Sequence, residues 1–480
     1  MKNTKKSLLA VASAALMLAN VSAVAACGVN NGPPDANVVA YDGSAVTVTF
    51  YHTMGKNLQD VLNLYIPVFN EMYPNITIEH QQIGGYDDVC DQISQELQAN
   101  NSPHIAYCYP DHVALYNKAK RVLTLDDYIA SKETVTKADG TTEIMGFTDA
   151  QIADFVPAYY NEGKAYGDDK MYTLPYSKST ELLYYNKTYF EQNNYKVPTT
   201  WDEMETLCAT IKAAEPNNIP LGYDSEANWF ITMCEQLGIP YTSATGDKFL
   251  FNTPDHIEFV TEFSDWYNKG YVTTEEIYGS YTSGLFTNQD TTKPRSYMCI
   301  GSSGGAAHQI PATIKDAEGK DVYPFEVGIA AIPQANPDKP KVISQGPSLV
   351  LFKKSEQEQA ATWLFAKFLT TTVDLQAEWS MESGYAPVIQ SVETNDVYKA
   401  FLEGANGYDL LPALASKQAI AQKDAYYVSP AFDGSSAARK AVGLLMQTCF
   451  IKKDIGNMSV ADFIKNAFDD TIEELEFDFS

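Results

Sequence analysis

The stretch Thr173–Lys187, with the sequence TLPYSKSTELLYYNK, decides the fold. It begins with Leu174-Pro175, and a proline suits a strand edge or a crossover because it cannot donate to a β-ladder. A polar run from Ser177 to Thr180 follows, and the apolar run from Leu182 to Tyr185 then predicts a buried strand. Small hydroxyl groups on irregular backbone beside a buried strand are typical of binding sites. The stretch is therefore either a core strand entered through a turn or a strand preceded by the wall of a binding site.

The N-terminus has the parts of a secretory signal. A segment with three lysines precedes an apolar run from Leu8 to Ala19 and the tetrapeptide Val24-Ala-Ala-Cys27. The tetrapeptide resembles a bacterial lipobox, which predicts removal of residues 1–26 and a diacylglyceryl group on Cys27. Two acyl chains are sufficient for stable anchoring, and residues 27–45 form a flexible tether. We therefore expect a lipid-anchored protein on the extracellular face of a bacterial membrane; the alternative is an ordinary signal peptide with an accidental cysteine.

The composition limits the classes of partner. The chain has 480 residues and a formal net charge of −27, so we expect two or three domains and no nucleic-acid partner. Its only arginines are Arg121, Arg295 and Arg439, which argues against a substrate held by an arginine cluster. The cysteines after Cys27 are widely spaced, so disulfides and isolated buried thiols both stay open.

Strands and helices alternate in the first third of the chain. This alternation predicts a mostly parallel sheet covered on both faces, and in such sheets ligands bind beyond the carboxyl ends of the strands. The segments at these ends are Tyr51-His52, Gly84 to Tyr86 and Tyr109 to Asp111.

Further loops have the composition of polar binding sites. The predicted strand Ser296–Ile300 leads into Gly301-Ser302-Ser303-Gly304-Gly305, where hydroxyls and backbone amides can hold polar or anionic oxygens. The loop lacks the lysine of a phosphate-binding P-loop. The turn from Glu382 to Pro387 carries Tyr385 between glycine and alanine. Two capping boxes, Thr200 to Glu203 and Ser355 to Glu358, predict helix starts.

These features together resemble one family over nearly the whole mature chain: the sugar-type extracellular solute-binding proteins of bacterial ABC importers. The resemblance is carried by the lipobox, Phe69-Asn70 with Pro74, Leu125 to Tyr128, Leu174-Pro175, Leu183 to Lys187, Pro198 to Glu203, the Gly301 loop and Gly384 to Pro387. Each motif is weak alone, and their order and spacing make the match specific.

The resemblance implies an α/β protein with a two-lobed, periplasmic-binding-protein-like (type II) fold. The ligand then lies between two lobes, each a mostly parallel sheet flanked by helices, and stabilises the closed form by hinge closure. The expected boundaries are 46–158 for the first part of the N-lobe, 159–344 for the first part of the C-lobe, 345–391 for the return to the N-lobe and 392–480 for the C-terminal helices of the C-lobe.

Within the family, the segments around the cleft are most similar to the glycerol-3-phosphate-binding members. The resemblance, with the strand ends, gives these candidate ligand contacts: Tyr51, His52, Tyr86, Asp111, Ser179, Trp229, Ser302, Ser303, Gly346 and Tyr385. Lys178 is a secondary candidate for a sugar hydroxyl or an anion. For His52 and Trp229 the sequence equally allows a structural role, and for Asp111 it favours a helix N-cap over a sugar-hydroxyl acceptor.

The ligand class follows from one departure from the family pattern. Where the glycerol-phosphate binders carry a phosphate-gripping arginine, this chain has Ser429 to Asp433, and Arg439 comes later. We therefore expect a neutral mono- or oligosaccharide, held by aromatic faces, hydroxyls and a carboxylate. The alternative ligand is glycerol-3-phosphate or a glycerophosphodiester.

Other classes of function have less support. A secreted glycoside hydrolase would need paired carboxylates across a cleft, and the sequence carries no nucleophile elbow or HExxH motif. A surface adhesin lipoprotein would need only the anchor. We expect no enzyme activity, no cofactor and no metal, since His104 and His112 are isolated. We expect a monomer that delivers its ligand to the membrane subunits of an ABC permease.

Overall fold

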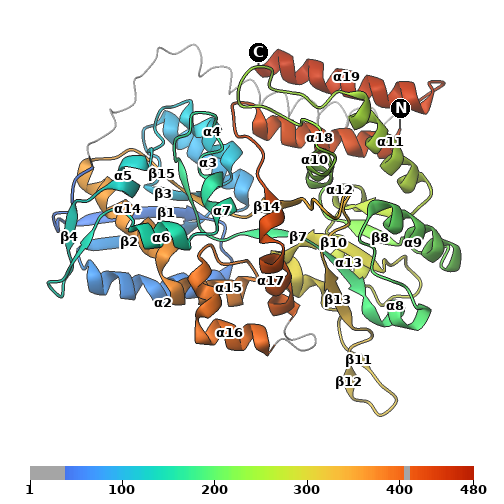
Figure 1. The fold of residues 1–480 in the computed structure, drawn as a ribbon, viewed down its shortest axis with the longest axis horizontal. Coiled ribbons are helices and arrows are strands. Elements are labelled where there is room, and N and C mark those ends of the chain that lie inside the picture. The colour runs from blue at the N-terminus through green and yellow to red at the C-terminus, as the bar shows by residue number, and fades with distance from the viewer. Residues whose placement is uncertain (1–37, 405–410, 454, 480) are drawn as a thin grey trace, which may run out of the picture.

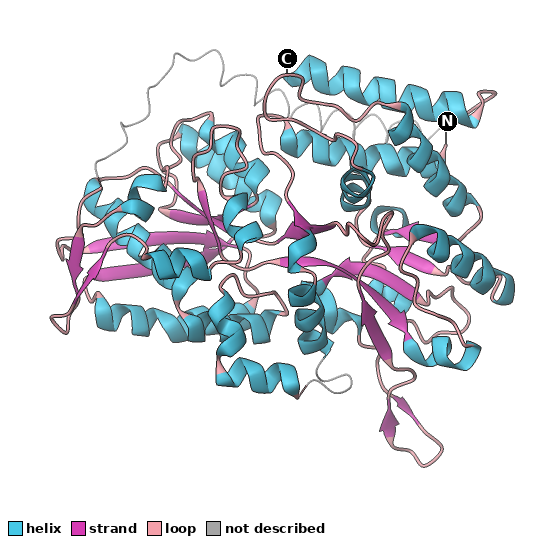
Figure 2. Cartoon of the chain, viewed as in Figure 1, coloured by secondary structure: helices cyan, strands magenta, loops and turns pink. Residues whose placement is uncertain are grey.

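The computed structural model describes residues 38–404, 411–453 and 455–479. Cys27, the signal segment and most of the tether lie outside the described residues. The described chain forms two lobes joined by several crossing segments (Figure 1). Each lobe has a central sheet with helices around it, as Figure 2 shows.

The first lobe contains a five-stranded sheet in the order β2-β1-β3-β15-β6. β1 pairs in parallel with β2 and β3, whereas β15 is antiparallel to both β3 and β6. Its strands are β1 (Val46–His52), β2 (Ile76–Gln82), β3 (Ile105–Cys108), β6 (Thr173–Pro175) and β15 (Ser348–Leu351). Its helices are α2 (Lys56–Met72), α3 (Tyr86–Gln98), α4 (Pro110–Asn117), α5 (Asp126–Ala130), α6 (Asp149–Asp154), α7 (Pro157–Glu162), α14 (Glu356–Thr371) and α15 (Val373–Ser383), with a hairpin of β4 (Thr134–Thr136) and β5 (Thr142–Ile144).

The second lobe is built on β7 (Ser179–Asn186), which pairs antiparallel with β10, β13 and β14. The other strands are β8 (Leu221–Tyr223), β9 (Val272–Thr274), β10 (Met298–Ser302), β13 (Val327–Ala330), β14 (Val342–Gln345) and β16 (Tyr426–Tyr427), with a projecting hairpin of β11 (Ile314–Lys315) and β12 (Asp321–Val322). The helices are α8 (Lys187–Asn193), α9 (Trp201–Ala214), α10 (Glu226–Leu237), α11 (Pro254–Asn268), α12 (Glu275–Tyr278), α13 (Ser283–Phe286), α17 (Leu411–Ala421), α18 (Ser435–Ile451) and α19 (Val460–Phe479), with 3₁₀ helices η2 (Ser303–Gln309) and η5 (Lys423–Ala425). η3 (Gln390–Thr394) and α16 (Asp396–Glu403) pack against α15 of the first lobe, and α16 also contacts α17 of the second.

The two-lobed α/β class is confirmed, but the sheets are mixed rather than mostly parallel. The physical reason is the connection between lobes. β7 carries the chain out of the first lobe and β15 carries it back. Each strand therefore pairs antiparallel with neighbours in its sheet, whereas a βαβ crossover would make the pairing parallel. Both predicted capping boxes form at the helix starts, with Thr200 bonded reciprocally to Glu203 and Ser355 to Glu358.

The first crossing lies later in the chain than expected. β6 still pairs with β15 in the first sheet, and α7 contacts β6, so the boundary at residues 158–159 falls inside the first lobe. The chain crosses between Pro175 and Ser179 and returns between Gln345 and Ser348. The sequence did not locate the boundary because Leu174-Pro175 indicates the edge of a strand but not the sheet in which the strand pairs.

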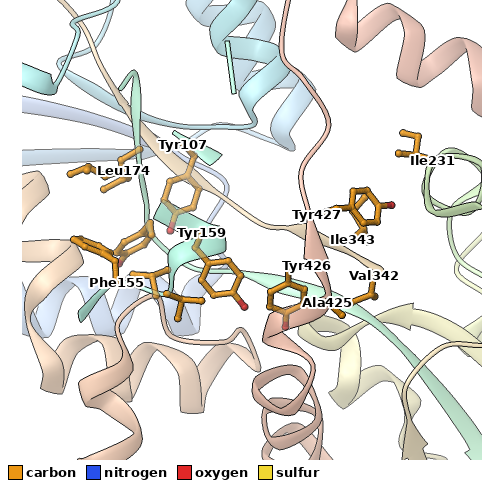
Figure 3. Close-up of a cluster of buried hydrophobic side chains, with 14 of the residues drawn as sticks. Tyr107, Phe155, Tyr159, Leu174, Ile231, Val342, Ile343, Ala425, Tyr426 and Tyr427 are labelled. Carbon is orange, nitrogen blue, oxygen red and sulfur yellow. The ribbon is translucent and has the colours of Figure 1, made fainter. Parts of the chain in front are cut away.

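A buried core continues through the hinge (Figure 3). Tyr159 of α7 stacks on Tyr426 of β16, with ring centroids 5.3 Å apart. Tyr107 lies towards the first lobe and Tyr427 towards the second, and both are buried. Apolar packing therefore supports the crossing segments, and the polar binding groups lie beside this core.

The lobes also contact each other across their facing surfaces. Asp87 at the start of α3 pairs with Lys440 of α18 at 3.0 Å, and Lys118 pairs with Asp433 at 2.6 Å. The backbone N–H of Ala431 donates to the carbonyl oxygen of Ala165, at 2.7 Å. These contacts describe a closed arrangement of the two lobes.

The cysteines from Cys90 to Cys449, for which the sequence allowed either disulfides or isolated thiols, are all free and buried in the described structure. Among residues 38–404, 411–453 and 455–479, no helix has the length and apolar content that a membrane crossing requires.

Candidate ligand-binding cleft

A cavity of about 130 Å³ lies where the two lobes meet the crossing segments. The first lobe contributes the end of β3, the start of α4 and the end of α7. The second contributes α10, β14, the chain after β16 and the first turns of α18. Its lining residues are Tyr109, Pro110, Asp111, Glu162, Ile231, Tyr241, Ile343, Ser344, Gln345, Gly346, Val428, Ser429, Pro430, Ala431, Ser435 and Arg439. The expectation that ligands lie beyond the end of β3 is consistent with this placement.

Arg439 lines this cavity, although it comes later in the chain than the arginine of the glycerol-phosphate binders. α18 begins at Ser435, after Gly434 has turned the chain with a φ of 109°, and its first turns face the cavity. The guanidinium donates through Nη2 to Asn228 Oδ1. The sequence does not mark Arg439, because the turn at Gly434 and the start of α18 bring a residue six positions after Asp433 to the cavity that Ser429 also lines.

Asn228 connects Arg439 to a buried carboxyl group on the hinge strand. Its Nδ2 donates to Glu181 Oε1 at 2.8 Å and to Gln345 Oε1 at 3.1 Å. Tyr223 donates to the other oxygen of Glu181, at 2.6 Å. Burial raises the pKa of Glu181 to about 7, although the hydrogen bonds from Tyr223 and Asn228 and the charge of Arg439 oppose this rise.

Glu181 predicts a loss of stability as the pH rises. The folded protein holds the proton up to about pH 7 while the unfolded chain releases it near pH 4.5, so stability falls between these values and levels off above them. In the wild-type protein this change lowers the free energy of unfolding by up to about 3 kcal/mol between these pH values, and we expect the Glu181→Gln variant to lack it. Urea denaturation of both proteins at pH 5 and pH 7.5 measures it. Parallel pH dependences of the two proteins would contradict the assignment, and because Glu275, whose pKa burial also raises to about 7, is common to both, its effect cancels.

Tyr86 and Tyr385 come together beside the cavity. Tyr86 stacks on Tyr109, with ring centroids 4.4 Å apart, and forms a hydrogen bond with Tyr385. Burial raises the pKa of both hydroxyls, so they stay neutral donors. Across the gap, a methyl group on Gly304 would come within 2.8 Å of the Tyr385 ring. The aromatic cluster of the first lobe therefore closes onto the Gly/Ser loop of the second.

The close approach at Gly304 makes closure sensitive to side-chain size. We expect Gly304→Val to hold the lobes apart and weaken ligand binding about tenfold, because overpacking of this contact costs roughly 1–3 kcal/mol. Gly305→Val is the matched control, since a side chain there meets nothing within 4 Å. Small-angle X-ray scattering of the liganded proteins measures the closure. Equal compactness and affinity of the two variants would rule the contact out as a determinant of closure.

Asp111 and Gly346 also line the cavity, whereas the predicted serines Ser179, Ser302 and Ser303 do not. Ser303 Oγ accepts from the backbone N–H of Thr180, at 3.2 Å, and Ser302 Oγ accepts from that of Gly304. Ser179 is paired with Gln345 in the ladder between β7 and β14. In this arrangement the serines fix the loop and the hinge strand.

Three predicted contacts are placed away from the cavity. Trp229 is fully buried in the core of the second lobe, stacked on Tyr223 with ring centroids 4.8 Å apart. His52 is buried against His80, with ring nitrogens 2.9 Å apart, and burial lowers its pKa to about 3. Tyr51 donates to Glu96 of α3 at 3.2 Å. Each has a structural partner, and none lines the cavity.

The secondary candidate Lys178 is also engaged. Its Nζ is completely buried and lies 2.6 Å from Glu162 Oε1. Sequence reasoning missed Glu162, which lines the cavity from the end of α7. No sequence signal marks it, because its partner Lys178 is sixteen positions away and beyond a strand.

Two lobes with a shared cavity at their hinge define the class of bacterial two-lobed solute-binding proteins. Residues 65–402 match the sequence profile described as bacterial extracellular solute-binding protein, and the chain belongs to that family. It is similar to the sn-glycerol-3-phosphate-binding periplasmic protein UgpB of Salmonella typhimurium, with 25% identity over 369 residues that cover 73% of this chain and 76% of that protein.

Solved structures share the fold. The cyclic alpha-maltosyl-1,6-maltose binding protein from Arthrobacter globiformis superposes with a TM-score of 0.67 and 20% identity, covering 90% of this chain and 99% of that one. UgpB from Mycobacterium tuberculosis, in complex with glycerophosphocholine, gives 0.68 and 16% identity, covering 91% and 98%. The match to the family profile confirms the family predicted from the sequence. Of these two neighbours, one is named for binding cyclic alpha-maltosyl-1,6-maltose and the other was solved with glycerophosphocholine.

Proposed function

We propose that this chain captures a neutral carbohydrate between its lobes and delivers it to an ABC permease. The observation that carries the ligand class is the balance of charge in the cavity. Asp111, Glu162 and Arg439 line the cavity, and Lys178 forms an ion pair with Glu162. The two carboxylates balance the two cations, so the site has no excess positive charge to hold an anion. Carboxylates and a guanidinium around aromatic rings suit hydroxyl groups, which both donate and accept.

The proposal extends to the cell surface and to the partner. Cleavage before Cys27 and its acylation would hold a monomeric binding protein at the extracellular face of the membrane. Tyr86, Asp111, Gly346 and Tyr385 are proposed ligand contacts, and Ser179, Ser302 and Ser303 support them. Closure around the sugar would present the closed lobes to the permease, and no catalytic step is involved.

The second candidate ligand is a glycerol phosphate or glycerophosphodiester. Arg439 in the cavity favours it, because a guanidinium is the preferred partner of a phosphate. The Salmonella typhimurium relative named for glycerol-3-phosphate binding supports it as well.

Isothermal calorimetry separates the two ligand classes. The panel contains glucose, maltose, larger maltodextrins, other neutral mono- and disaccharides, glycerol-3-phosphate and glycerophosphocholine. Micromolar or tighter binding of a neutral sugar, without binding of the phosphates, is the expected result. Tight binding of a glycerol phosphate with no sugar bound would replace the first proposal by the second, and turnover of an oligosaccharide during the titration would point to a hydrolase.

A further inference from the structure

Glu162 has one carboxylate oxygen that the protein itself does not use. The side chain is 3% exposed and ends α7 at the wall of the cavity. Oε1 lies 2.6 Å from Lys178 Nζ and accepts from Ser348 Oγ at 3.3 Å. Oε2 is buried and has no hydrogen-bond partner among the described residues.

A buried carboxylate oxygen without a donor is costly, by roughly 1–3 kcal/mol for a polar group and more for a charged one. The other polar atoms at this part of the wall do not relieve it. The Gly346 carbonyl oxygen already accepts from Lys178 at 3.2 Å and cannot donate, and Asp111 adds a second acceptor to the lining. Because Glu162 lines the cavity, a ligand bound there can bring a donor to Oε2.

We propose that Glu162 is a ligand contact, with Oε2 accepting a hydrogen bond from a hydroxyl group of the bound carbohydrate. This inference rests on the proposed function and names which chemical group of the ligand lies at the hinge end of the cavity. A hydroxyl satisfies Oε2, whereas a phosphate oxygen there would face a second negative charge without a proton to share. Glu162 therefore selects for hydroxyl and against phosphate at this end of the site.

The contact also lies where the two crossing segments meet. Lys178, in the first crossing, donates to Ser348 Oγ at 2.9 Å and to the carbonyl oxygen of Gly346 in the second. Glu162 belongs to α7 of the first lobe, so its ion pair ties that lobe to both crossings. A ligand bound to Oε2 is thereby connected to the hinge through one ion pair.

The test compares Glu162→Gln and Glu162→Asp with the wild-type protein against the same panel of neutral sugars, glycerol-3-phosphate and glycerophosphocholine. The glutamine removes the negative charge, and the aspartate keeps the charge but withdraws the oxygens from the cavity. Glu143→Gln is the matched control, because Glu143 is the ion-pair partner of the buried Lys367 on the first lobe and does not line the cavity. Thermal melting of each unliganded variant establishes that it is folded.

We expect both Glu162 variants to bind the sugar at least roughly tenfold more weakly and Glu143→Gln to bind it as the wild type does. Monodeoxy analogues of the sugar identify the contact. For one analogue, the missing hydroxyl should weaken binding to the wild-type protein about as much as the Glu162→Asp substitution weakens binding of the complete sugar. The Glu162→Asp variant should bind that analogue and the complete sugar with the same affinity. If Glu162→Gln fails to fold, the aspartate variant and the analogues still decide.

Unchanged affinity in both Glu162 variants, or equal additional losses for every deoxy analogue, would overturn the assignment while the sugar-binding function stood. A wild-type protein that binds none of the panel would overturn the proposed function and this inference together.

Discussion

Replacing Arg439 by alanine is expected to weaken ligand binding by about 100-fold. The guanidinium has five donors in a fixed fork, and only its bond to Asn228 is made within the described protein, so the remaining donors are free to meet ligand oxygens. Charge-assisted hydrogen bonds are each worth roughly 1.5–3 kcal/mol, and losing one or two gives this factor. Calorimetry with the best ligand of the panel measures the loss.

Two further variants give the Arg439 result its meaning. Arg439→Lys keeps the positive charge but loses the planar guanidinium donors. We expect this variant to bind the ligand less than tenfold more tightly than Arg439→Ala does. Arg121→Ala is the control for a lost arginine, since Arg121 pairs with Asn100 and does not line the cavity. An Arg439→Ala protein that binds as tightly as the wild type would remove this residue from the site. A loss of all binding by a phosphate ligand, with sugar binding intact, would favour the second candidate function.

The fold was predictable from the sequence because its signals are local or ordered along the chain. The capping boxes at Thr200 and Ser355 form as their residues dictate, and β7 contains the predicted apolar run from Leu182 to Tyr185 but begins earlier, at Ser179. Motif order along the chain then gave the family. The direction of the sheets was not predictable in the same way, because it depends on which lobe each strand enters after a crossing, as β6 and β15 illustrate.

The site was predictable only where a strand end or a glycine turn carries it. Tyr86, Asp111, Gly346 and Tyr385 are such residues, and the structure places them in or beside the cavity. Arg439 and Glu162 reach the cavity from helices whose orientation is a tertiary property, so no local pattern marks them. Trp229 shows the reverse error: an aromatic residue near a predicted loop is equally suited to a core, and here Tyr223 and Phe263 surround it.

The interlobe ion pairs contribute little to the closed arrangement. The pairs Asp87–Lys440 and Lys118–Asp433 lie at the surface, and such pairs contribute little because water screens them. To move a population from 1:99 to 99:1 closed, a ligand must prefer the closed form by about 5.5 kcal/mol. That preference has to come from groups that touch the ligand from both lobes at once, and Asp111 of the first lobe and Arg439 of the second both line the cavity.

Replacing Gly346 by alanine is expected to destabilise the folded protein by about 4 kcal/mol. The residue has a φ of 105°, which L-residues other than glycine rarely adopt, at a cost of roughly 1–3 kcal/mol. An added methyl group would also lie 2.6 Å from the carbonyl oxygen of Ser177 and 3.1 Å from the Cα of Lys178. Both neighbours are backbone atoms of the other crossing segment, so the clash costs a further 1–3 kcal/mol or so and pushes the two crossings apart.

Gly319→Ala is the matched control for the backbone term alone. Gly319 lies in the turn between β11 and β12 with a φ of 79°, and an added methyl group there meets nothing within 4 Å. We expect this variant to lose only about 1 kcal/mol. Urea denaturation of the wild type and both variants measures the difference. A Gly346→Ala protein as stable as Gly319→Ala would mean that the crossings can separate without cost, and the hinge would then lack the tight backbone contact that ties Lys178 and Glu162 to the second crossing.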